Sequence, residues 1–135
     1  MKKCLSAALT ALFLAGCAHT STLDWTPPVS GQKSSEGNPV VANMVAVNNG
    51  MFLFNCIPLW SGHPTSPNRQ EYKIGQNKLT RANMRRQLEC FLDQLKADRV
   101  EDVKMSEHSS GMMGLWIIWK RSLRGEAVAV KVEKQ

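Results

Sequence analysis

The chain has 135 residues, of which 43% are hydrophobic and 21% charged, with four cysteines and a formal net charge of +6. It is long enough for one globular domain, too short for two full domains and too apolar to be disordered throughout. Because nothing in this composition identifies a reaction, the sequence defines compartment and fold better than activity.

The first 17 residues carry the pattern of an export signal. Lys2 and Lys3 form a positively charged start, residues 5–14 form an apolar run, and two small residues precede Cys17. This arrangement is typical of a signal peptide. A transmembrane helix needs roughly 20 apolar residues, about twice the length of this run. We therefore expect a cleaved signal and not a membrane span.

Leu14-Ala15-Gly16-Cys17 resembles the lipobox of bacterial lipoproteins. The resemblance implies cleavage before Cys17, transfer of diacylglycerol to its sulfur and acylation of the new amino group. In enterobacterial lipoproteins an Asp after the lipidated Cys favours inner-membrane retention, so Ala18 implies the outer membrane, with the protein facing the periplasm. Two or three acyl chains are enough for stable anchoring. No other cofactor is expected.

Three segments follow from this pattern: a signal peptide over residues 1–16, the lipidated cysteine with a flexible tether over 17–38, and one domain over 39–135. The tether is predicted from its many Ser, Thr, Pro and Gly residues, and Pro27-Pro28 excludes a helix there. At about 3.3 Å per residue, a fully extended tether would hold the domain up to about 60 to 70 Å from the membrane.

β-Branched and apolar residues predict a β-hairpin at the start of the domain. Its strands are expected over residues 39–47 and 51–59, because Asn48-Asn49-Gly50 is a strong turn signal between them. Residues 60–70 contain two prolines and a glycine. They are predicted to form a loop, where functional residues tend to lie.

An amphipathic helix is predicted from Thr80, its N-cap, to Ala97. Its apolar stripe consists of Met84, Leu88, Phe91, Leu92 and Leu95. Cys90 points roughly 100° or more away from the centre of this stripe. An oxidising periplasm would preserve a disulfide between Cys56 and Cys90. The direction of Cys90 nevertheless favours two free thiols over that bond.

Three short strands are predicted after the helix, over residues 100–105, 115–120 and 126–132, with turns at 108–111 and 122–125. The expected fold is α+β: a small, mostly antiparallel sheet in ββ-α-β-ββ order with one helix packed on a face. Residues 53–62, 97–100 and 125–127 are similar in outline to small envelope lipoproteins such as the outer-membrane sensor of the Rcs pathway and TRL-like proteins. The paired-disulfide framework of that sensor is not reproduced here.

Motifs for catalysis are lacking: the sequence contains no phosphate loop, HExxH, GxSxG or paired CxxC. A hydrolase would have to use Cys56 or Cys90 as nucleophile, with His63 or His108 as base. A copper or zinc site would draw on His63, His108, Met105, Met112 and Met113, which have no regular ligand spacing. We expect neither an enzyme nor a metal centre.

Basic residues gather at the start of the predicted helix, although Glu89 and Asp93 can pair with them internally. With the loop over 60–70 they define a candidate partner surface, which consists of Trp60, His63, Arg69, Lys78, Arg81 and Arg85. The expected partner is another envelope protein or an anionic envelope polymer, and a periplasmic address argues against nucleic acid. The sequence thus favours a non-enzymatic docking module. A ligand-binding or metal-binding sensor lipoprotein is the alternative.

Overall fold

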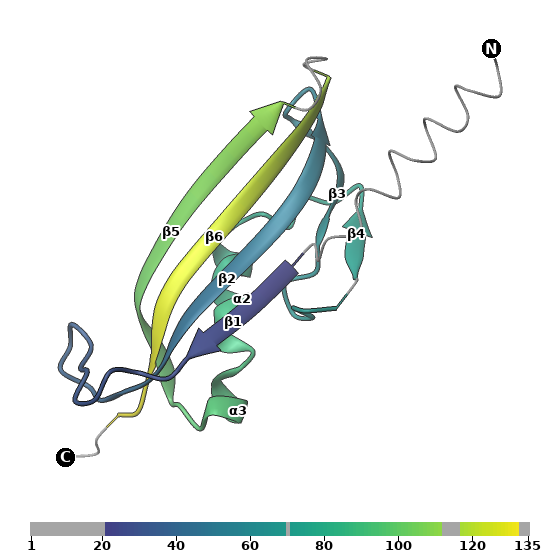
Figure 1. The fold of residues 1–135 in the computed structure, drawn as a ribbon. Helices are drawn as coiled ribbons and strands as arrows, with labels where there is room; N and C mark the ends of the chain where they lie inside the picture. Colours follow the sequence, from purple (N-terminus) through teal and green to yellow (C-terminus); the bar gives the residue numbers. More distant parts are fainter. Residues whose placement is uncertain (1–20, 70, 112–116, 133–135) are drawn as a thin grey trace, which may run out of the picture.

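The computed structural model describes residues 21–69, 71–111 and 117–132. In these residues six strands form one antiparallel sheet, and two short helices lie on one side of it (Figure 1). The elements in chain order are β1 (Ser21–Thr26), β2 (Val40–Leu53), β3 (Ile57–Gly62), β4 (Tyr72–Ile74), α2 (Arg81–Glu89), α3 (Leu92–Leu95), β5 (Arg99–Gly111) and β6 (Ile118–Val130). The predicted α+β class and the mostly antiparallel sheet are confirmed.

The strand order is β4-β3-β2-β6-β5, and β1 is a further neighbour of β2. β1 pairs with residues 43–48 of β2, whereas β3 pairs with residues 50–53 of the same strand. On its other side, β2 pairs with β6 along almost its whole length. β1 and β3 therefore lie end to end along one edge of β2.

The sheet buries one face and leaves the other open. Along β2 the even-numbered residues from Val40 to Phe52 are buried, and the odd-numbered residues are half-exposed. α2 packs on the buried face so closely that a Cβ on Gly125 of β6 would come within 2.7 Å of Met84. We call the opposite side the open face, because no helix covers it in the described part of the chain (Figure 1).

The predicted helix is present, with a break near its middle. Thr80 is the N-cap, and its hydroxyl accepts a hydrogen bond from the Asn83 N–H at 3.2 Å. α2 ends with Cys90 as its C-cap, and α3 follows after Phe91. Met84 and Leu88 of the predicted stripe are fully buried, and the other stripe residues, Phe91, Leu92 and Leu95, pack against the core.

The β-hairpin is also present, but its predicted turn is wrong. Asn48 and Gly50 lie inside β2, and the chain reverses at Phe54 and Asn55, which have φ angles of 49° and 60°. Asn48 is buried, and its Nδ2 donates to the Gly62 carbonyl at 3.3 Å. A Cβ on Gly50 would approach Leu79 to 2.9 Å. Close packing, and not a turn, therefore accounts for this glycine.

Two long strands replace the three short ones predicted after the helix. Residues 108–111 are the end of β5, and residues 122–125 lie inside β6, so neither predicted turn occurs. Gly125, which suggested a turn, instead makes room for α2. In residues 21–69, 71–111 and 117–132 the observed order is four strands, two helices and two strands, in place of ββ-α-β-ββ.

The predicted flexible tether is wrong for the residues that the structure describes. Residues 21–26 form β1, which pairs with β2, and Leu23 is only 2% exposed. Further along, the Ser34 N–H donates to the Asn38 carbonyl at 2.9 Å, and Lys33 and Pro39 form an antiparallel bridge. The domain therefore includes residues 21–38. The predicted signal peptide and Cys17 lie outside the described residues.

Candidate functional site

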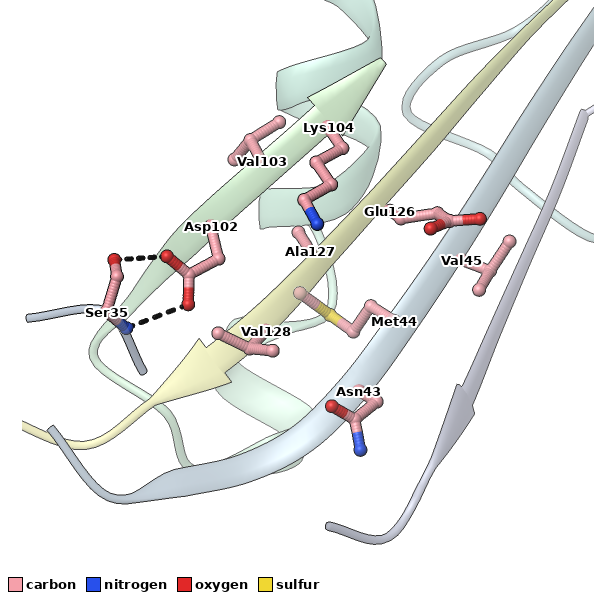
Figure 2. A pocket seen from close by; sticks show the side chains of 10 residues that line it. All are labelled: Ser35, Asn43, Met44, Val45, Asp102, Val103, Lys104, Glu126, Ala127 and Val128. Atoms are coloured by element: carbon pink, nitrogen blue, oxygen red, sulfur yellow. Dashed lines mark hydrogen bonds between the residues drawn. The ribbon is translucent and has the colours of Figure 1, made fainter. Parts of the chain in front are cut away.

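The open face contains a groove at the end of the sheet where β1 stops and β5 begins. It has a volume of about 680 Å³ and lies over β2, β6 and the start of β5 (Figure 2). The residues that give the groove its polar character are Ser35, Asn43, Asp102, Lys104 and Glu126. Val45 and Val128 add apolar surface. Such a mixed surface suits contact with another molecule.

Asp102 holds the segment around Ser35, which forms one side of this groove, by accepting hydrogen bonds. It lies where the register of β5 against β6 shifts, and its φ of 53° turns it out of the regular strand. Ser35 donates to its carboxylate twice, from the hydroxyl and from the backbone N–H, the latter at 3.0 Å (Figure 2). These two donors, the hydroxyl first, lower the pKa of Asp102 although burial opposes the shift.

Glu101, the residue before Asp102, is 6% exposed and anchors the same loop. Asn38 donates to its Oε1 at 2.8 Å and Arg99 donates to it at 2.6 Å. The pKa of Glu101 is lowered mainly by the Ser34 hydroxyl and further by Arg99 and Asn38, although burial opposes them. Glu101 and Asp102 thus remain ionised near neutral pH and serve as hydrogen-bond acceptors, not as proton donors.

The structure distributes the six predicted partner-surface residues over different sides of the domain. Trp60 lies on the open face, opposite Met51 of β2 and 6.4 Å from the ring of Tyr72. The three basic residues Lys78, Arg81 and Arg85 precede or belong to α2, on the other face. His63 and Arg69 belong to the connection between β3 and β4.

The expected internal pairing of the basic helix is confirmed at one position. Arg85 pairs with Glu89 at 2.9 Å, one helical turn along. In the β3–β4 connection, Arg69 lies 3.9 Å from Glu71. These exposed ion pairs reduce the positive charge available to a partner and add little stability.

Cys90 and Cys56 are both free, as the direction of Cys90 indicated. Cys90 lines a second hollow, of about 250 Å³, together with Pro67 and Arg69. Its Sγ donates to the Gln87 carbonyl at 2.9 Å, and burial raises the pKa of the thiol. This environment favours the neutral thiol and not the nucleophilic thiolate.

Cys56 differs from its prediction as a residue of an apolar strand, because it is exposed in the turn between β2 and β3. The imidazole Nδ1 of His63 lies 3.0 Å from the Thr65 hydroxyl. His108 belongs to β5 and is opposite Ser122 of β6. Two strands, β6 and β2, separate β5 from β3, which precedes His63. The structure therefore does not bring the two histidines together.

Metal-ligating residues do not gather in the described parts of the chain: no group of three His, Cys, Asp or Glu side chains could hold an ion there. Met105 packs against the core next to Gly125, whereas His108 lies on the open face. Met112 and Met113 lie outside the described residues.

Asn68 is a structurally important residue that the sequence analysis missed. Its side-chain amide accepts from the Leu23 N–H at 3.1 Å and donates to the Leu23 carbonyl at 2.8 Å. Its own backbone N–H donates to the Ser21 carbonyl at 2.8 Å. Asn68 thereby occupies the outer edge of β1, where another strand would otherwise pair.

Gln87 was missed as well, and it holds β1 from the helix side. It is fully buried in α2, and its Nε2 donates to the Thr22 carbonyl at 2.8 Å. Because Gln87 follows Met84 by three residues, helical spacing places it on the buried side of α2. That spacing was the available signal that this polar side chain faces the sheet.

Comparison with known proteins adds no relative: no family model, curated protein or solved structure matches the chain. In the described residues, none of the helices has the length and apolar character needed to cross a bilayer. A functional interpretation must therefore rest on the residues of this chain.

Proposed function

We propose that this protein is a bacterial lipoprotein whose domain is a non-enzymatic docking module of the cell envelope. The observation that carries the proposal is the lipobox-like Leu14-Ala15-Gly16-Cys17 directly before a folded domain. In this proposal, residues 1–16 are removed and Cys17 carries diacylglycerol and an N-acyl chain. Ala18 in place of Asp favours the outer membrane, with the domain in the periplasm.

Docking is the activity for which the open face is best suited. Its groove offers charges of both signs, with Lys104 opposite Glu126 and Asp102 nearby, beside the apolar Val45 and Val128. Protein interfaces combine such apolar and polar groups. The carboxylates at this end are engaged in hydrogen bonds, and the cysteine in the second hollow has a raised pKa. These features support binding more than acid–base or thiol chemistry.

The proposed partner is another envelope protein or an anionic envelope polymer. Trp60 belongs to the same open face as the groove, at the opposite end of β2. His63, Arg69, Lys78, Arg81 and Arg85 would form a second, more basic contact at the β3–β4 connection and the start of α2. Crosslinking in intact cells should capture one specific partner from probes on the open face.

Lipidation is tested by labelling cells with a radioactive or alkyne fatty acid and separating inner from outer membranes. The wild-type chain should carry the label and be found with the outer membrane. Cys17→Ser should lose both the label and the membrane association. Since Cys56 is exposed and free, Cys56→Ser is the matched control and should keep both.

Ala18→Asp adds a test of the destination. This substitution should leave the acyl label intact and move the protein to the inner membrane. Retention of label and membrane association by Cys17→Ser would overturn the proposal.

A further inference from the structure

Exposed apolar side chains gather on the open face at the β3–β4 edge of the sheet. Ile74 is 75% exposed, Tyr72 57% and Ile57 52%. Trp60 pairs directly with Ile74, and its ring lies 6.4 Å from that of Tyr72. We call these four residues the β4 patch. In a folded monomer such a group of large apolar side chains on one edge indicates a contact surface.

Lys120 borders this patch on the open face, and Lys73 lies on the reverse side of β4. Lys73 lies between Tyr72 and Ile74 in β4 and therefore projects to the other side of the strand. Lys120 of β6 is opposite Met51 on the open face, and Met51 is in turn opposite Trp60. Aromatic and aliphatic side chains next to lysines suit the interface of an anionic bilayer, where the ammonium groups remain among the headgroups.

The start of β1 lies close to this edge. Ser21 is opposite Asn48, whose side chain donates to the carbonyl of Gly62 at the end of β3. Gly62 is opposite Tyr72 of β4. Neighbouring strands are about 4.8 Å apart, so Tyr72 lies about one strand spacing beyond the end of β3 that Asn48 contacts.

The number of residues before Ser21 limits how far the domain can lie from a lipid on Cys17. Only three residues separate Cys17 from Ser21. Four Cα–Cα steps at 3.3 to 3.6 Å each span at most about 14 Å. A bilayer of 40 to 45 Å with a core of about 30 Å has headgroup layers of roughly 5 to 8 Å. The start of β1 would therefore lie at the headgroups.

We propose that the β4 patch rests on the surface of the same bilayer that holds the lipid on Cys17. The inference depends on the proposed lipidation, because the short connection matters only if Cys17 is the anchor. The occupant of the patch is the anionic headgroup layer: Tyr72 and Ile74 enter the interface, and Lys120, on the same face of the sheet, contacts the headgroups. The groove, at the other end of the open face, then lies farther from the membrane than the β4 patch.

The test uses the full, lipidated chain in vesicles of phosphatidylethanolamine and phosphatidylglycerol at about 3:1. An environment-sensitive fluorophore is attached at Ile74→Cys, in a background with Cys56→Ser and Cys90→Ser. Val29→Cys is the matched control, because Val29 is also 75% exposed and follows the opposite end of β1. Both positions are exposed, so neither substitution should affect folding.

The probe at position 74 should gain about twofold in emission on reconstitution and be quenched by shallow nitroxide lipids, because it enters a less polar layer. The probe at position 29 should do neither. Equal responses at both positions would overturn the inference. A response at position 74 that requires a high protein-to-lipid ratio would identify a second copy as the occupant, and would also overturn it.

Failure of this inference can be distinguished from failure of the proposed function. If the wild-type chain carries the acyl label and stays in the vesicles while the probe at position 74 remains in water, only the membrane contact is wrong. If Cys17→Ser behaves like the wild type in the labelling experiment, the anchor itself is wrong, and the membrane contact then loses its basis.

Discussion

The two ends of the open face differ in the side chains that they present: one end is polar and the other is apolar. At the groove end, Glu101 and Asp102 hold the loop over residues 27–39 through hydrogen bonds from Ser35 and Asn38. At the other end, the β4 patch exposes apolar rings and aliphatic chains. Glu101 and Asp102 at one end are thus already engaged within the molecule. The apolar groups of the other end can lose contact with water only on a second surface.

A single sheet can therefore combine, at one end, carboxylates held by hydrogen bonds within the molecule and, at the other end, apolar side chains exposed for contact. Both ends are joined by β2 and β6, which pair almost throughout their length. α2 supports the buried side of these two central strands. Changes in α2 should therefore lower the stability of the fold most. Changes that loosen β1 should lower it less, and changes at the groove end should lower it least.

The largest effect is expected from Leu88→Ala, which removes a fully buried side chain of α2. Loss of burial and the resulting cavity should lower the free energy of unfolding by about 2 to 5 kcal/mol. Urea unfolding measures this change, and hydrogen exchange should show faster exchange at both ends of the sheet. Leu88→Met conserves volume and should cost less than about 1.5 kcal/mol. Faster exchange at one end only would mean that the sheet is not one cooperative unit.

An intermediate effect is expected from Asn68→Ala. The substitution removes both side-chain hydrogen bonds to Leu23 and leaves an alanine at a φ of 63°. We expect a loss of about 2 kcal/mol in unfolding free energy, with the Leu23 amide exchanging faster than the amides of β6.

Asn68→Gly separates the two causes, because glycine adopts this φ without strain. It should retain about 1 kcal/mol of the stability that Asn68→Ala loses. If the glycine variant were as unstable as the alanine variant, backbone strain would play no part at this position.

The smallest effect on stability is expected at the groove end, when the pH is lowered. The folded state lowers the pKa of Asp102 and of Glu101 below their ordinary values of 3.8 and 4.5. A lowered pKa stabilises the fold above those ordinary values, and this contribution disappears as the pH falls through the folded-state pKa. The urea midpoint should therefore decrease as the pH falls below about 5, and the decrease should continue below those ordinary values because the folded-state pKa values are lower.

Asp102→Asn should show a smaller decrease over the same range, since asparagine does not titrate and tolerates the positive φ at this position. Exchange of the Ser35 amide would report the loosening directly. An equal acid dependence in the two proteins would assign the effect to other carboxyl groups.

Sequence patterns predicted the helical part of this fold well. The Thr80 cap and the stripe of Met84 and Leu88 depend on spacing within one helix, and both are confirmed. The α+β class followed from such local patterns. The lipobox reading also depends on adjacent residues, and it stays a prediction.

Features that depend on distant partners could not be predicted in the same way. Asn48 and Gly50 form a turn signal locally, but burial against Gly62 and Leu79 keeps them in a strand. Ser21 to Thr26 is too short and too close to Pro27 to stand out as a strand, and it becomes one through Asn68 and Gln87. The groove, assembled from three strands and a loop, had no signature in the sequence.

The hydrogen bond from Gln87 to β1 has a consequence for the order in which the parts of the chain fold. A chain delivered to its compartment with the N-terminus first presents residues 21–26 early, yet β1 lacks its hydrogen bond from Gln87 until residue 87 has arrived. β1 therefore stays incompletely held until residue 87 has been delivered. Under the proposed lipidation, the modifying enzyme would therefore reach Cys17 before Gln87 holds β1 in place.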